Sequence, residues 1–205
     1  MKSLLTFVFF VCFFSFSFLS KTTGQIDYKG MCSIGCPSFC REDCVRGLRR
    51  LEEILAKSPD INSRMEAAKS LGQFQGTGRI PILERALKKE PAEKVKEELK
   101  KSLLKAETDL LEKGSSSEKK EAMDRLQKGG YESSFLIEKF SSVLLTEPEE
   151  DVRTKAGNCL YWLGEEMKKK GEDIDKIVEV FKKSSEEDIS PTIRKGATQA
   201  LDRLK

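Results

Sequence analysis

Residues 151–160 read DVRTKAGNCL, and they contain the spacing that decides the fold. Arg153 is followed by Ala156 three positions later and by Leu160 seven positions later. On an α-helix these offsets fall on one face, so the residues form a buried stripe that begins beside a cation. The same spacing occurs in four further sets, Arg64–Ala67–Leu71, Lys96–Leu99–Leu103, Lys119–Ala122–Leu126 and Arg194–Ala197–Leu201. Recurrence of one helix type predicts stacked units that bury their stripes against one another.

The rest of the chain favours an all-α fold. Strand-type alternation is absent, and Gly and Pro residues stand mainly between the helical segments. Three of the four intervals between stripe cations suit a pair of helices, but the 23 residues from Lys96 to Lys119 are too few. We therefore expect an irregular second unit there. Residues 131–145 are apolar around most of a helix, which predicts burial on more than one side.

The N-terminus is typical of an export signal. A short cationic start containing Lys2 precedes the apolar run of residues 4–19, and Thr22 and Gly24 supply small residues two apart. An uncleaved anchor is the alternative, although 16 residues are fewer than the roughly 20 that span a bilayer. We expect a periplasmic or secreted protein with three segments: a signal peptide (1–24), a cysteine-rich segment with a capping helix (25–57) and a repeat domain (58–205).

Four cysteines spaced four apart, Cys32, Cys36, Cys40 and Cys44, lead into an amphipathic helix over residues 40–57. In an exported chain such a cluster favours two disulfides that staple this helix. Pro37 disfavours helix at Cys36, so the first two cysteines can fold back as a loop. The pairing stays open between Cys32–Cys44 with Cys36–Cys40 and the crossed arrangement. Metal ligation and redox activity are the alternatives, and no CxxC pair supports redox activity.

The composition bears on several function classes. The chain contains no histidine, which removes histidine-based nucleophile systems and histidine-ligated zinc or iron sites. Removing a leader that carries Lys2 and Lys21 leaves a net charge near +1, which argues against a dedicated nucleic-acid or anionic-membrane binder. No residues suggest a catalytic set, a metal site with histidine or a cofactor.

The candidate binding residues are Tyr161 and Trp162. At about 100° per residue, Tyr161 points away from the Val152–Leu160 stripe and Trp162 lies on its flank. Exposed aromatic side chains are favoured binding anchors, whereas the alternative is that both pack against neighbouring helices. Cys159 falls on the apolar face, which predicts a buried, unpaired thiol.

Several segments together resemble HEAT-type repeats, including the HEAT-like repeats of bilin lyases. They are RMEAAKSLG (64–72), IPIL (80–83), Asp151-Val152-Arg153 with Ala156 and Leu160, and Ile193-Arg194 with Ala197, Ala200 and Leu201. The resemblance covers residues 58–205 and implies an α-solenoid of helical hairpins. It also implies that the acidic–basic pair Asp151 and Arg153 ties adjacent repeats together, a role extended to Arg64 and Arg194. Catalytic HEAT-like metalloenzymes use histidine–glutamate motifs, which this chain cannot supply.

These features predict an exported, non-catalytic helical-repeat scaffold that binds a protein or peptide partner. The alternative is an enzyme-accessory or metal-binding protein that uses the Cys32–Cys44 cluster. Repeats of this kind serve many unrelated tasks, so the fold does not select between the two.

Overall fold

The computed structural model describes residues 41–204, and it confirms the all-helical prediction. Nine α-helices and no strand occur in this range. The elements are α2 (Arg41–Lys57), α3 (Ile61–Gln73), the 3-10 turn η3 (Thr77–Arg79), α4 (Ile80–Lys89), α5 (Glu93–Lys113), α6 (Ser116–Lys128), α7 (Ser133–Thr146), α8 (Glu150–Lys170), α9 (Asp175–Glu187) and α10 (Pro191–Leu204). The export signal, Cys32, Cys36 and Cys40 lie outside the described residues.

Local signals set several of the helix ends. Asp60 caps α3, because its carboxylate accepts hydrogen bonds from the backbone N–H groups of Asn62 and Ser63. Ser115 and Glu118 form a reciprocal capping box at the start of α6. Gly171 ends α8 with φ at 71°, a left-handed conformation that glycine adopts without strain.

The five helices that carry the repeated spacing, α3, α5, α6, α8 and α10, are called the stripe helices here. Each packs against the next, and α2, α4, α7 and α9, the covering helices, pack against them. Eight of the ten apolar stripe positions are buried, and the other two, Leu103 and Leu201, are partly exposed. The repeated spacing therefore marks the surfaces through which successive helices contact one another.

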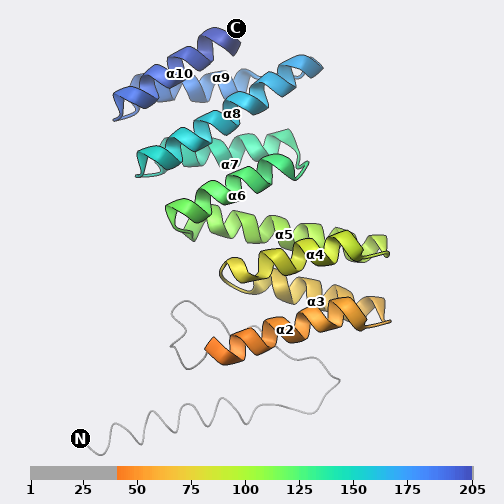
Figure 1. Cartoon of the computed structure of the whole chain (residues 1–205). Coiled ribbons are helices and arrows are strands. Elements are labelled where there is room, and N and C mark those ends of the chain that lie inside the picture. Colours follow the sequence, from red (N-terminus) through yellow and green to blue (C-terminus); the bar gives the residue numbers. More distant parts are fainter. Residues whose placement is uncertain (1–40, 205) are drawn as a thin grey trace, which may run out of the picture. The chain divides into compact units, whose positions relative to one another are not determined.

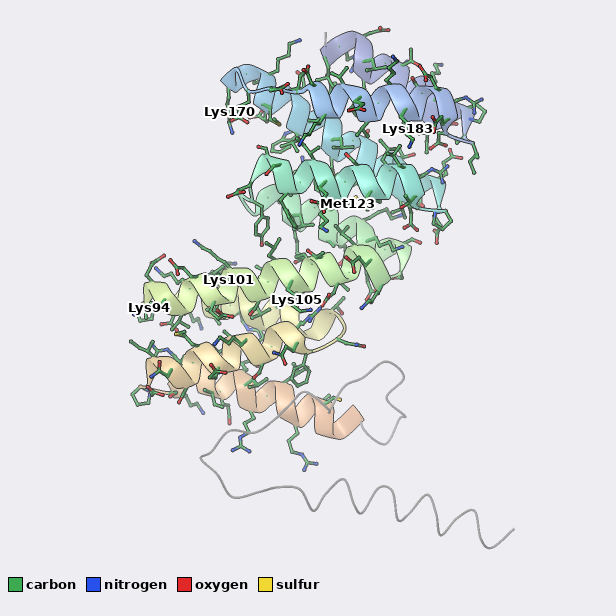
Figure 2. The ribbon with its side chains drawn as sticks, turned by 180° about the vertical axis from the view of Figure 1, so that it is seen from behind. Lys94, Lys101, Lys105, Met123, Lys170 and Lys183 are labelled. Carbon is green, nitrogen blue, oxygen red and sulfur yellow. The ribbon has the colours of Figure 1, made fainter. Side chains whose placement is uncertain are left out.

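The second unit is irregular, as the short interval predicted. Only two residues separate the end of α5 at Lys113 from the start of α6 at Ser116, and no covering helix lies between them. In Figure 1, α4 lies in front of α5, whereas α7 and α9 lie behind α8 and α10. Figure 2, seen from behind, brings α5 with Lys101 and Lys105 to the front. The covering helices thus change sides of the stripe helices at the α5–α6 junction.

The predicted apolar helix corresponds to α7. Leu136, Ile137, Phe140, Val143 and Leu144 are buried, and α7 packs against both α8 and α9. The prediction of burial on more than one side is confirmed.

Arg153 connects the start of α8 to the segment between α9 and α10. Its Nε and Nη2 donate hydrogen bonds to the two carboxylate oxygens of Asp188, each at 3.0 Å. Its Nη1 donates to the backbone carbonyls of Glu147 at 2.9 Å and Pro148 at 2.8 Å. Because Asp188 lies in the connection from α9 to α10, the guanidinium joins the start of α8 to the start of the next stripe helix.

The same arrangement recurs at Arg64, which pairs with both carboxylate oxygens of Glu90 at 2.9 Å and donates to the carbonyl of Ser58 at 2.8 Å. Lys119 makes a simpler version, a 2.6 Å ion pair with Glu147. Arg194 differs, because its hydrogen bond goes to the carbonyl of Asp188, directly before its own helix.

Asp151 does not pair with Arg153. Its carboxylate instead pairs with Lys120 of α6. Both members of the predicted pair therefore connect neighbouring helices, but each does so through a different partner.

A partly buried ion pair joins α5 and α6 at the irregular junction. Arg125 Nε donates to Glu107 Oε1 at 2.7 Å, and the Glu107 side chain is only 1 % exposed. Burial raises the pKa of Glu107 above its usual range, against the opposing effect of Arg125. Glu84 raises this pKa further and Arg79 lowers it. The junction therefore holds a carboxylate that is costly to ionise.

The raised pKa of Glu107 should make the stability of the protein depend on pH. The pKa of Glu107 is higher in the folded state than the unfolded value of 4.5. The contribution of Glu107 to the free energy of unfolding is therefore fully present below the unfolded pKa. It is lost as the pH rises through the folded pKa. Glu107→Gln removes the titration and keeps an oxygen that can accept from Arg125. As the pH rises from about 4 to about 7, we expect the free energy of unfolding of this variant to increase relative to that of the wild type. Urea unfolding at both pH values measures the difference, and a constant difference would contradict the expectation.

Candidate binding groove

A groove with a volume of about 460 Å³ lies between the stripe helices α8 and α10. Its walls come from these two helices, and its floor includes Phe181 and Ser184 of α9 and Leu144 of α7, all of which are buried. In Figure 1, α8 and α10 lie in front of α7 and α9, as this arrangement of walls and floor requires.

Two helical glycines help to form the hollow. Gly157 lines the groove from α8 and Gly196 from α10. A Cβ atom added at Gly196 would meet nothing within 4 Å, and one at Gly157 would make only ordinary contacts, the nearest 3.7 Å from Leu144. Glycine inside a helix costs about 1 kcal/mol relative to alanine. Packing does not require glycine at either position, and the missing side chains leave the groove open.

Gly72 shows the contrasting case. A Cβ there would lie 2.8 Å from Oγ and 3.1 Å from Cα of Ser102, so the close approach of α3 to α5 requires a glycine. Gly157 and Gly196 in the groove make no such close contact with a neighbouring helix.

The charged residues that line the groove are all cationic. Arg153 is neutralised by Asp188, whereas Lys195 and Arg203 are exposed and form no ion pair or hydrogen bond with any described residue. No Asp or Glu lines the groove. Asn158, Thr192 and Gln199 add uncharged polar groups. The groove therefore combines an apolar floor with a positively charged rim.

One polar atom on the floor lacks a partner. Ser184 is 1 % exposed, and its Oγ has no hydrogen-bond partner. Buried hydroxyl groups in folded proteins are usually hydrogen-bonded, so an unpaired hydroxyl beside a hollow is available to a ligand.

The structure places the two aromatic candidates on different sides of α8. Tyr161 is partly exposed and lines the groove toward α10. Trp162 is 42 % exposed and does not line the groove. It shares a helix flank with Lys155 and Cys159, which contact Asp124 and Gln127 of α6. The two side chains therefore do not form one site.

Sequence reasoning missed Gly157, Gly196, Lys195 and Arg203. The available signal was the presence of glycine inside two amphipathic helices, which lowers helix stability without ending the helix. The partners of these residues across the groove depend on how α8 packs against α10, which the spacing does not give.

Cys44 and Cys159 are the two cysteines in the described part of the chain. Cys159 is buried, as predicted, and burial raises the pKa of its thiol to about 11, which keeps it protonated at neutral pH. Cys44 is partly exposed on α2, and the other members of its cluster lie outside the described residues, so the disulfides stay a prediction.

Two further features concern residues 41–204. No group of three or more His, Cys, Asp or Glu residues there is placed to hold a metal ion. None of the helices in this range is both long and apolar enough to span a membrane.

Comparison with known proteins returned no matching family model and no matching curated protein.

Proposed function

We propose that this protein is an exported, non-catalytic α-solenoid of HEAT-like helical hairpins that binds a protein or peptide partner in the α8–α10 groove. The observation that carries the proposal is the hollow that Gly157 and Gly196 leave open between two stripe helices. Helix-destabilising residues that no packing contact requires are typical of functional sites.

The lining chemistry supports a polypeptide ligand. Phe181 and Leu144 make the floor apolar, while Tyr161 and Asn158 on one wall and Gln199 on the other offer hydrogen-bonding groups. Tyrosine is enriched among the residues that contribute most to protein interfaces. A peptide presents both apolar side chains and backbone polar groups, so it can use the floor and the walls together.

Photo-crosslinking tests this proposal. A benzophenone amino acid is placed at Tyr161 in one variant and at Trp162 in another, and each full-length protein is irradiated in an extract of its native compartment. The two positions are neighbours on one helix, but only the first lines the groove. We expect a crosslinked partner from position 161 and none from position 162.

The control is the same benzophenone variant at Tyr161 combined with Gly196→Leu, which fills part of the groove. The crosslink should then disappear. A partner that crosslinks equally from both positions, or that persists after the groove is filled, would contradict the proposal.

A further inference from the structure

We infer that the groove takes an acidic peptide segment, with an apolar side chain over the glycine-lined floor and carboxylates beside Lys195 and Arg203. This inference rests on the proposed function and names the chemical class of its partner. The charge, the spacing and the unpaired groups of the lining support it.

The charged residues that line the groove are all positive. Two exposed cations on the rim have no partner among the described residues, and no carboxylate lines the groove to neutralise them. Charge complementarity favours an anionic partner, and the same cations disfavour a basic segment. The chain as a whole carries 37 cations and 34 anions, so this groove departs from the near balance of the molecule.

The cations are spaced along one edge of α10. Lys195, Gln199 and Arg203 follow one another at four-residue intervals, which places them on one side of the helix. The two cations are eight positions apart in the helix, so their Cα atoms lie about 12 Å apart along the axis at about 1.5 Å per residue. A segment with two carboxylates about 12 Å apart would therefore satisfy both cations.

The floor fits the rest of such a segment. An apolar side chain that enters between Gly157 and Gly196 would contact Phe181 and Leu144 and would bring peptide groups near the unpaired hydroxyl of Ser184. Ser184 Oγ can donate to a peptide carbonyl there. A purely polyanionic ligand such as a nucleic acid would leave this apolar floor unused.

The test is selection from a random displayed-peptide library. The full-length folded protein is the target, and clones that also bind the Gly196→Leu variant are removed. We expect the remaining peptides to be enriched in Asp and Glu around a Leu or Phe. Binding of a selected peptide to the double variant Lys195→Glu/Arg203→Glu should weaken by about tenfold or more, and added salt should weaken binding to the wild type.

The matched control carries the same charge change at Lys182→Glu/Lys183→Glu on α9, whose side chains are exposed and do not line the groove. Lys183 is labelled in Figure 2, which views the molecule from the side opposite to Figure 1. The control should bind the selected peptide as the wild type does.

The outcomes separate the two claims. Groove-dependent peptides without acidic enrichment would overturn the inference and leave the proposed function standing. Equal weakening by both double variants would also overturn the inference, because a general charge effect would explain the result. Recovery only of peptides that bind regardless of Gly196→Leu would overturn the inference and the proposed function together.

Discussion

Replacing Arg153 with methionine should lower the free energy of unfolding by about 3–5 kcal/mol, because breaking a buried ion pair from one side leaves the other charge uncompensated. Arg153 and Asp188 are 5 % and 7 % exposed, and both guanidinium–carboxylate hydrogen bonds are 3.0 Å long. The substitution also frees the carbonyls of Glu147 and Pro148. One side chain thus holds together two helix connections that lie far apart in the sequence.

Urea unfolding followed by circular dichroism measures this effect. Lys169→Met is the control, since its ion pair with Glu166 is exposed and lies within a single helix. Exposed pairs contribute little to stability, so this variant should unfold almost as the wild type does. Equal losses in the two variants would show that Arg153 does not tie the units together.

The all-helical fold could be predicted because one local spacing recurs. Offsets of three and seven define a helix face without knowledge of any partner, and the structure buries Ala156 and Leu160 on that face. The irregular second unit could also be predicted, since the interval between Lys96 and Lys119 leaves too little chain for two helices. Both predictions rest on properties of single segments.

Long-range pairing could not be predicted in the same way. The resemblance suggested a role for Arg153 in joining repeats, but its partner Asp188 lies 35 residues away and cannot be identified from spacing alone. Which carboxylate reaches the guanidinium depends on the length of the intervening hairpin and on its packing angle. Asp151 is nearer in sequence, yet its position places it beside Lys120.

The candidate site was predictable only in part. Tyr161 could be placed opposite the buried stripe from helix geometry, and it lines the groove. Helix geometry also showed that Trp162 points elsewhere, but not that it lies outside the groove. The hollow itself depends on side chains that are absent, at Gly157 and Gly196, and on a neighbouring helix that does not fill the space.

The second large effect concerns binding. A Cβ atom at position 196 meets nothing within 4 Å, so a leucine there should fill part of the groove without strain. Removing a helical glycine should leave stability unchanged or raise it by up to about 1 kcal/mol. The bound partner, however, would meet the new side chain where it contacts the floor. We expect its affinity to fall at least about tenfold, or about 1.4 kcal/mol.

The groove is therefore tested most directly by calorimetric titration of a captured partner, or of a selected peptide, into Gly196→Leu and Gly196→Ala. The two variants replace the same glycine and differ only in how far the new side chain reaches. We predict near-normal affinity for the alanine variant and a loss of at least about tenfold for the leucine variant, with both proteins folded. Equal affinities for the two variants would show that the partner binds elsewhere.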